Sequence, residues 1–286
     1  MSIEPLHPQV NWLPLGSVAP NDLVEARLQA HFAAQVASGF GRTHVPTKDD
    51  DNHTALYWRR GQGGLQSHAS TGADPLHAVL EFSPHRLTLV DGSGSVKSTW
   101  IPNGNTLDQG YQCLSAAIAE ATDKPETPIT ALHYEMPNHE LSRGAAFLHG
   151  LEDRVAEIGR WIGNAHYLLV ETVGAESSAS EITCWPHHFD IATLIDLGNG
   201  RSIGIGLSTG DTSYAEPYWY VSPYPYPKPE ELPALGDKGH WHSEGFTAAI
   251  LTATEVVASS SAHEQHATCK QFLQTAIAAG KKALGI

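Results

Sequence analysis

The sequence predicts a mixed α+β fold, in which antiparallel β-meander sheets are covered by helices in two similar helix–meander–helix halves. Three observations support this prediction. Short runs of β-branched and aromatic residues follow one another at tight-turn spacing, and strands joined in this way pair antiparallel. Long segments with apolar residues at helical spacing precede and follow these runs. This order occurs twice, so we divide the chain into residues 1–142 and 143–286, closely packed on each other.

The first half begins with an amphipathic helix, expected over residues 22–38. Asn21 is its N-cap, and Gly39 and Gly41 are expected to end it. The strands expected after it cover residues 55–59, 77–82, 87–90 and 96–101. A capping-box sequence at Thr106 then predicts a second helix.

The second half begins with a long helix over residues 151–169, whose apolar residues recur at every third or fourth position. The strands expected after it cover residues 182–185, 189–197, 203–208, 218–221 and 241–251. Ser261 caps a final helix with an inward stripe that includes Cys269 and Phe272. Residues 125–150 are the candidate boundary between the halves.

Composition and charge argue against several classes of partner. The 286 residues include 31 acidic and 17 basic ones, which give a formal net charge of -14. Binding to nucleic acid or to an acidic membrane needs clustered Lys and Arg, whereas the only adjacent basic pairs are Arg59-Arg60 and Lys281-Lys282. No apolar run reaches the length of a membrane span. We expect neither nucleic acid nor membrane as a partner, and the oligomeric state stays open.

Cysteine usage and the N-terminus bear on the compartment. Cys113, Cys184 and Cys269 are far apart in the sequence and form no C-x-x-C pair, which argues against a disulfide framework and against a cysteine zinc knuckle. The first residues lack the basic start and apolar stretch of an export signal. We therefore expect a soluble protein of the reducing cytoplasm.

The most informative stretch places His240, His242 and Glu244 on alternate residues of an expected strand, where they share a face. Two imidazoles and a carboxylate are typical ligands of zinc or non-haem iron, and His187 is a candidate fourth ligand, so a divalent transition metal is one interpretation. A second is metal-free acid–base catalysis by His242 with Glu244 or Asp190. A third is a buried polar network without chemistry.

The alternation that follows Trp185 bears on these interpretations. Ile191 and Ile195 mark the odd-numbered face of the expected strand as buried, which points His187 inward and Asp190 away. The pattern alone therefore does not complete a metal site.

An aromatic, proline-rich stretch over residues 214–227 predicts an extended wall of rings with hydroxyl tips. Such walls bind sugars, aromatic compounds or peptides, although an edge strand that leaves into a rigid loop fits equally well. The candidate ligand-binding residues are Trp219, Tyr220 and Tyr224, together with Trp185 and, from the first half, Asn52 and His53.

A nucleotide cofactor is not expected. The glycines of residues 204–210 lie within and beyond an expected strand, and no helix follows to offer its N-terminus to a phosphate.

Short segments in a fixed order carry a resemblance over nearly the whole chain. They are Asn52-His53, Leu56-Tyr57, Gly64-Leu65, His85-Arg86-Leu87, Trp185 with Phe189-Asp190-Ile191-Ala192, Gly206, Gly210, Glu216, Trp219-Tyr220, Tyr224-Pro225, His242 and Glu244. In these segments the chain resembles an uncharacterised bacterial family catalogued as a domain of unknown function. The family has two small residues where this chain has Pro186-His187-His188. The resemblance implies a shared fold and pocket and no particular activity.

These observations predict a pocket lined by His, Glu and Tyr side chains for a small polar metabolite. The expected catalytic residues are His242, Glu244 and Asp190. A hydrolase or an isomerase fits better than a redox enzyme, because no nicotinamide or flavin motif is present. The alternative is a noncatalytic ligand-binding or structural protein.

Overall fold

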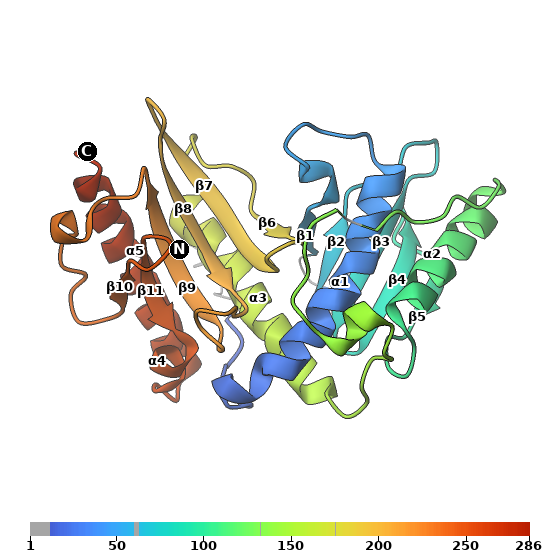
Figure 1. Cartoon of the computed structure of the whole chain (residues 1–286), viewed down its shortest axis with the longest axis horizontal. Helices are drawn as coiled ribbons and strands as arrows, with labels where there is room; N and C mark the ends of the chain where they lie inside the picture. The colour runs from blue at the N-terminus through green and yellow to red at the C-terminus, as the bar shows by residue number, and fades with distance from the viewer. Residues whose placement is uncertain (1–11, 60–62, 132, 175) are drawn as a thin grey trace, which may run out of the picture.

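The computed structural model describes residues 12–59, 63–131, 133–174 and 176–286. Within these ranges the backbone forms five α-helices and one 11-stranded sheet (Figure 1). Every pair of neighbouring strands runs antiparallel. The prediction of an α+β fold with an antiparallel sheet is therefore confirmed.

The strands lie across the sheet in the order β10-β11-β9-β8-β7-β6-β1-β2-β3-β4-β5. Their bounds are β1 Leu56–Arg59, β2 Gly64–Ser67, β3 Leu76–Phe82, β4 His85–Asp91, β5 Val96–Trp100, β6 Thr183–Trp185, β7 Asp190–Gly198, β8 Arg201–Ser208, β9 Tyr218–Tyr224, β10 His240–His242 and β11 Ala248–Thr252. β1 and β6 join through one residue pair, Leu56 opposite Cys184, and both residues are fully buried. This pairing makes one sheet of β1–β5 and β6–β11.

The helices pack on one face of this twisted sheet. Their bounds are α1 Val24–His44, α2 Leu107–Thr122, α3 Glu152–Val173, α4 Ala253–Val257 and α5 Ala262–Ala283. α1 lies on β2 and β3 with α2 beside it, α3 contacts β3 as well as β7 and β8, and α5 lies on β9. Because sheets twist, the helices stand in front of β1–β5 and behind β7–β9 in Figure 1. α3 therefore links the two ends of the sheet through one core.

We call the other face of β7–β9 and β11 the open face, because no helix of the described residues packs along it and only the N-terminal part of α1 approaches it, across a cavity. Alternation separates the two faces, because odd-numbered residues such as Ile191, Ile205 and Trp219 belong to the core under the helices. Even-numbered residues point the other way. On the open face they are Asp190, Ala192, Leu194, Gly204, Gly206, Ser208, Tyr218, Tyr220, Ser222, Ala248 and Ile250.

The first helix is longer than expected, since α1 continues through Gly39 and Gly41 to His44. Both glycines lie where the chain approaches closely. A Cβ atom on Gly39 would stand 2.6 Å from Ile129 Cγ2, and one on Gly41 would stand 2.4 Å from the carbonyl oxygen of His53. The expectation that they end the helix was wrong, because packing and not helix termination requires glycine here.

The expected strand over residues 241–251 is instead a hairpin of two strands, β10 and β11. His240 lies opposite Ile250 and His242 opposite Ala248. Glu244 lies in the exposed turn between the strands and does not continue the alternation of the two histidines.

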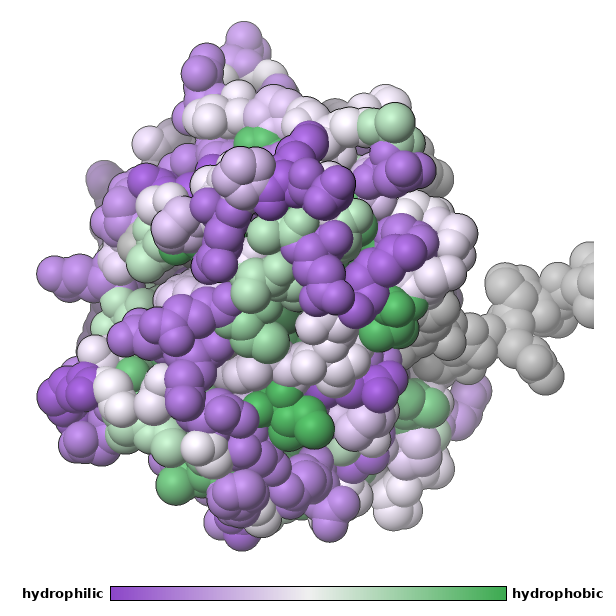
Figure 2. All heavy atoms as spheres, turned by 90° about the vertical axis from the view of Figure 1, so that its right-hand side faces the viewer, coloured by the Kyte–Doolittle hydropathy of each residue, from purple (hydrophilic) through white to green (hydrophobic). Residues whose placement is uncertain are grey.

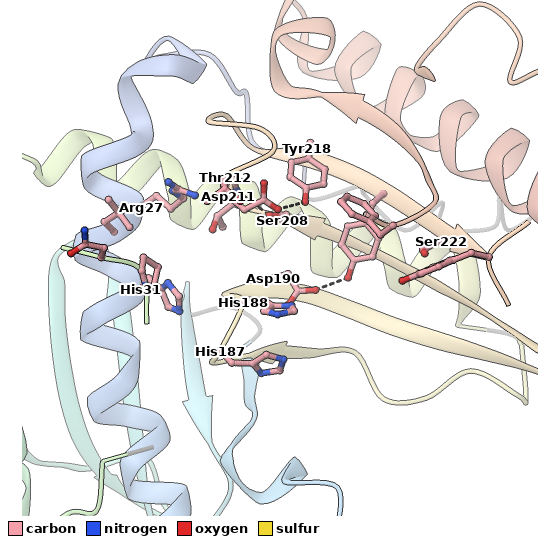
Figure 3. A pocket seen from close by; sticks show the side chains of 18 residues that line it. Arg27, His31, His187, His188, Asp190, Ser208, Asp211, Thr212, Tyr218 and Ser222 are labelled. Atoms are coloured by element: carbon pink, nitrogen blue, oxygen red, sulfur yellow. Dashed lines mark hydrogen bonds between the residues drawn. The ribbon is translucent and has the colours of Figure 1, made fainter. Parts of the chain in front are cut away.

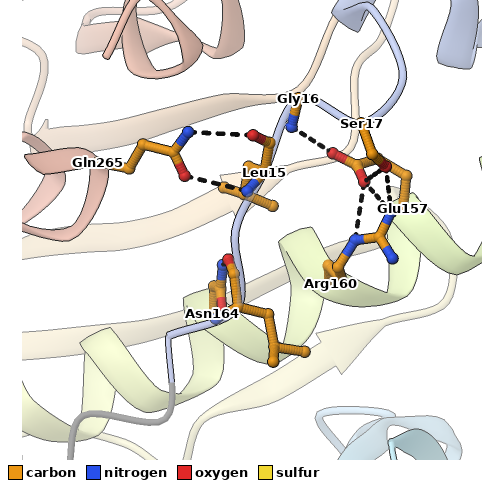
Figure 4. A network of polar contacts seen from close by, with 8 residues as sticks. Leu15, Gly16, Ser17, Glu157, Arg160, Asn164 and Gln265 are labelled. Carbon is orange, nitrogen blue, oxygen red and sulfur yellow. Dashed lines mark hydrogen bonds and ion pairs between the residues drawn. The ribbon is translucent and has the colours of Figure 1, made fainter. Parts of the chain in front are cut away.

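A segment ahead of α1 ties α3 to α5 (Figure 4). Asn164 on α3 accepts a hydrogen bond from the N–H of Leu13 at 2.9 Å and donates one to the Leu13 carbonyl oxygen at 2.8 Å. Gln265 on α5 likewise accepts from the N–H of Leu15 and donates to its carbonyl oxygen, both at 3.0 Å. The fully buried carboxylate of Glu157 accepts from the N–H of Gly16 at 2.7 Å. Side chains thus satisfy this backbone where no strand pairs with it.

The end of the molecule formed by β5 and α2 has a mixed surface. Figure 2 shows it as largely hydrophilic with small, separate hydrophobic spots. No helix in the described ranges is long and apolar enough to cross a membrane.

Candidate functional site

A cavity of about 820 Å³ lies on the open face, between β7–β9 and the N-terminal part of α1 (Figure 3). Arg27 and His31 of α1 form one wall, and Asp190 and Tyr220 of the sheet form another. The remaining polar groups come from the turn between β6 and β7, from the end of β8 and the segment that follows it, from β9 and the residues after it, and from Asn138 between α2 and α3. The cavity therefore joins residues that are far apart in the sequence.

Asp190 and Tyr220 form a hydrogen-bonded pair at the floor of this cavity. The Tyr220 hydroxyl donates to Asp190 Oδ2 at 2.5 Å. Asp190 is 8% exposed, and its other oxygen, Oδ1, is buried without a hydrogen-bond partner among the described residues. Desolvation raises the pKa of Asp190, while the Tyr220 hydrogen bond and the nearby His188 and His187 act in the opposite direction. Burial also raises the pKa of Tyr220 well above its usual value.

Gly206 makes room for this pair. It lies on β8, between Asp190 on β7 and Tyr220 on β9, directly opposite Tyr220. A Cβ atom here would stand 2.7 Å from the Tyr220 hydroxyl oxygen and 2.6 Å from the carbonyl oxygen of Ile191. The tyrosine can cross the middle strand because that strand has no side chain at this position.

His187 and His188 enter the cavity from the turn between β6 and β7. The N–H of Phe189 closes this turn on the carbonyl oxygen of Trp185 at 2.8 Å, and Phe189 takes a positive φ of 56°. The two imidazole ring centres are 4.2 Å apart. Burial lowers the pKa of His187, with His188 adding to the effect, so the imidazole of His187 is largely neutral at pH 7.

His31 supports the same turn from α1. Its Nε2 donates to the carbonyl oxygen of Pro186 at 2.8 Å, and its ring stacks on Phe189 with 5.1 Å between ring centres. Burial lowers the pKa of His31 to about 4, so this side chain is neutral at pH 7. It positions the histidine turn without adding charge.

Arg27 and Asp211 lie at the other end of the cavity. Asp211 accepts hydrogen bonds from the Tyr218 hydroxyl at 2.6 Å and from the N–H groups of Ser213 and Tyr214 at 2.7 and 3.0 Å. Arg27 makes no hydrogen bond or ion pair within the described ranges, and its Nε is buried without a partner. Desolvation lowers the pKa of Arg27, and the charge of Asp211 acts against this.

A second cavity of about 680 Å³ adjoins the first on the open face and shares its central residues. The shared residues are His187, His188, Asp190 and Tyr220. Lys48, Asn52, Glu181 and Trp185 are among the residues that line only the second cavity. The Asp190–Tyr220 pair thus stands where the two cavities meet.

The structure brings together several residues named from the sequence. Asp190, Tyr220 and His187 line both cavities, and Trp185 and Asn52 line the second. Arg27, His31, Tyr218 and Asp211 were not named. For Tyr218 the sequence contains a usable indication, since it lies two residues before Tyr220 on the same strand face.

The predicted metal set His240, His242, Glu244 and His187 does not come together. Tyr214 Oη lies 3.0 Å from His240 Nε2 and 3.1 Å from His242 Nδ1. His242 Nε2 donates to the backbone carbonyl oxygen of Glu244 at 2.8 Å, and the Glu244 side chain is exposed. Within the described part of the chain, no three His, Cys, Asp or Glu residues are arranged to hold a metal ion.

Three other candidates lie outside the cavities. His53 is buried, and its Nδ1 accepts from the N–H of Lys48 at 3.2 Å. Trp219 is fully buried on the helix-covered face of β9. Tyr224 is 55% exposed and stands edge-on to Tyr226, which does line the first cavity.

No protein-family model, curated protein or solved structure matches this chain. The family resemblance seen in the sequence therefore stays a prediction.

Proposed function

We propose that the protein binds a small polar metabolite in the cavity on the open face, and that Asp190 is the acid–base group that acts on it. One observation supports this most strongly. The Asp190 carboxyl is buried where two cavities meet, with one oxygen held by Tyr220 and the other without a partner. A buried polar atom without a partner is rare unless a ligand or water satisfies it.

The surroundings suit proton transfer, as in an isomerase or in a hydrolase that activates water. Burial raises the pKa of Asp190 and lowers that of His187, so a carboxyl group with an increased proton affinity and a largely neutral imidazole line the same cavities. Pairs whose pKa values are shifted apart in this way can divide the roles of acid and base. We assign the acid–base role to Asp190 with His187, and the orienting role to Tyr220.

We also propose that residues 1–142 and 143–286 are two similar halves. Each contains strands joined as a meander and helices that cover them, and both contribute walls to the cavity.

The three cysteines, Cys113, Cys184 and Cys269, are all unpaired. This supports a reducing compartment such as the cytoplasm as the place of action.

The second candidate is noncatalytic binding of the same ligand. It is favoured by Asp211, whose oxygens already accept hydrogen bonds from Tyr218, Ser213 and Tyr214, an arrangement that suits a fixed recognition surface. Binding without turnover would leave the ligand chemically unchanged, so isotope incorporation separates the two functions.

The test is incubation of the purified protein in D₂O with a defined mixture of amino acids, hydroxy acids, sugars and sugar phosphates, followed by mass spectrometry. Proton transfer leaves deuterium at a carbon atom, and hydrolysis gives a new product mass. We expect at least one compound to change with the wild-type protein and to change at least 100-fold more slowly with Asp190→Asn, the typical contribution of a general acid or base.

Asp196→Asn is the matched control, because Asp196 lies farther along the same strand, β7, and lines neither cavity. It should act at the wild-type rate. A compound that changes equally with Asp190→Asn would remove Asp190 from the mechanism. Binding of a compound without any change would favour the noncatalytic alternative.

A further inference from the structure

We infer that the ligand of the first cavity is a small zwitterion, whose carboxylate pairs with Arg27 and whose ammonium group donates to Asp190. This inference rests on the proposed function, because it specifies the ligand class of the same cavity. It starts from two groups of opposite charge that line one cavity and lack partners at their buried atoms.

Arg27 is the anion-binding end. It extends from α1 toward the segment that contains Asp211 and Thr212 (Figure 3). Its Nε is buried and unpartnered, and no carboxylate of the described residues forms an ion pair with it. Asp211 offers only a longer-range attraction, because its oxygens are already occupied by Tyr218 and by backbone N–H groups. A planar guanidinium with free donors fits a carboxylate.

Asp190 is the cation-binding end. Tyr220 occupies Oδ2 and leaves Oδ1 as a buried acceptor in the same cavity. A buried acceptor without a partner destabilises the fold, and an ammonium N–H would satisfy it. His187 and His188 bring imidazole donors near the carboxylate, but no hydrogen bond joins either ring to Oδ1.

Aromatic side chains form part of the cavity wall. Tyr218, Tyr220, Tyr226 and Phe246 line the cavity, and Phe246 packs against the cluster of Tyr218, Ala248 and Ile250 on the open face. Aromatic faces attract cations and apolar groups. A ligand body with an apolar or aromatic part between its charged ends matches these walls.

The charges of the cavity also disfavour ligands with a single charge. A simple anion would approach Asp190 and Asp211 as well as Arg27, and a simple cation would leave Arg27 unpaired. A zwitterion pairs both unpartnered groups and adds no net charge to a partly buried site, where unpaired charges are costly.

The experiment measures binding of defined probes by isothermal titration calorimetry. Three zwitterions with different charge spacing, L-phenylalanine, 4-aminobutanoate and 4-(aminomethyl)benzoate, are compared with benzoate and benzylamine. We expect at least one zwitterion to bind tenfold or more tightly than either singly charged compound. Arg27→Met should weaken the binding of that zwitterion and of benzoate about tenfold and leave the binding of benzylamine unchanged. Asp190→Asn should weaken the binding of the zwitterion and of benzylamine and leave the binding of benzoate unchanged.

Two further variants keep the test specific. Arg27→Lys retains the charge and should recover part of the affinity, whereas Arg86→Met removes a cation paired with Glu81 on β3 and should change nothing. Circular dichroism and thermal unfolding show whether each variant is folded.

The inference is overturned if all probes bind with the same affinity or if no zwitterion binds. It is also overturned if Arg27→Met and Asp190→Asn each weaken the binding of benzoate and benzylamine to the same extent. The isotope experiment separates this failure from failure of the proposed function. If a compound is still turned over in an Asp190-dependent manner while zwitterions do not bind, the acid–base function stands and the ligand class is wrong.

Discussion

Two carboxylates of the same cavity have different surroundings. Asp211 accepts three hydrogen bonds, two from backbone N–H groups and one from Tyr218, which fix it as a structural acceptor. Asp190 has one such bond and a buried free oxygen. A carboxylate that the fold leaves incompletely paired is available for a ligand, at some cost to stability.

This cost predicts that Asp190→Asn stabilises the protein at high pH. The folded-state pKa of Asp190 is raised by burial, so its stabilising contribution is complete below the ordinary value of 3.8 and is lost as pH rises through the folded-state pKa. Asn keeps an acceptor for Tyr220 and carries no charge. Urea unfolding at pH 8 should show a gain of about 1 kcal/mol in the free energy of unfolding.

The gain should shrink toward pH 4, where the carboxyl becomes protonated. An equal difference between the two proteins at both pH values, or a less stable variant at pH 8, would show that Asp190 is not a desolvated carboxylate.

At the residue scale, the sequence indicated part of the site. Tyr220 could be named because it belongs to the aromatic, proline-rich stretch, and Asp190 because it is a carboxylate on the polar side of an expected strand. Arg27 and His31 could not, because the helix pattern identifies the apolar stripe and does not show what the polar residues beside it will meet. Only the tertiary packing of α1 against the histidine turn brings them to the cavity.

At the scale of elements, β8 carries two glycines on the open face with different surroundings. A Cβ atom on Gly206 would collide with Tyr220 and with the β7 backbone, whereas one on Gly204 would have its nearest neighbour 3.9 Å away. Gly206→Ala should therefore destabilise the protein by about 1–3 kcal/mol and displace Tyr220 from Asp190.

Gly204→Ala is the matched control on the same strand and face, and it should be neutral or slightly stabilising. Chemical denaturation of both variants, with Tyr220 followed by NMR, makes the comparison. Equal effects of the two substitutions would contradict the assigned role of Gly206.

The elements also show where local patterns are insufficient. The long helix predicted over residues 151–169 matches α3, because its apolar stripe is continuous. The alternation predicts one strand where the structure has the hairpin of β10 and β11, because His240, His242, Phe246 and Ala248 keep the same parity across the turn. The pattern therefore predicts His242 and Glu244 on one face of a strand, although Glu244 lies in the exposed turn.

At the scale of the whole molecule, one core extends from the segment before α1 to α5 and includes residues of every helix. α3 packs on both ends of the sheet, and Leu56 and Cys184 are buried where β1 meets β6. We predict a single cooperative unfolding transition by calorimetry, with equal calorimetric and van't Hoff enthalpies. Two separable transitions would show that the ends of the sheet fold independently.

Buried histidines predict loss of stability in acid. Burial lowers the pKa of His31 and of His85 to about 4 each. Each therefore stabilises the fold fully above the ordinary value of 6.5, and this stability is lost as pH falls through about 4. Each contributes up to roughly 3 kcal/mol, since one pKa unit corresponds to about 1.4 kcal/mol.

His85→Gln removes one of these groups at a position outside the cavities. Urea unfolding between pH 7 and 4.5 should show a shallower decline for the variant. Parallel declines for both proteins would contradict this origin of the acid sensitivity.

The order of strands across the sheet was beyond the reach of the sequence patterns. The alternation predicted most strands and their antiparallel pairing within each meander. It contains no information on the pairing of β1 with β6 or on the insertion of β11 between β9 and β10. These contacts depend on residues distant in sequence.

The most direct test of the site is the pH titration of the Asp190 carboxyl carbon by ¹³C NMR, assigned with Asp190→Asn. We predict a midpoint above the ordinary aspartate value of 3.8, and a further rise in Tyr220→Phe, because the tyrosine hydrogen bond stabilises the carboxylate. A midpoint at or below 3.8 in the wild-type protein would contradict the account, because it would mean that Asp190 is a solvated or fully paired carboxylate.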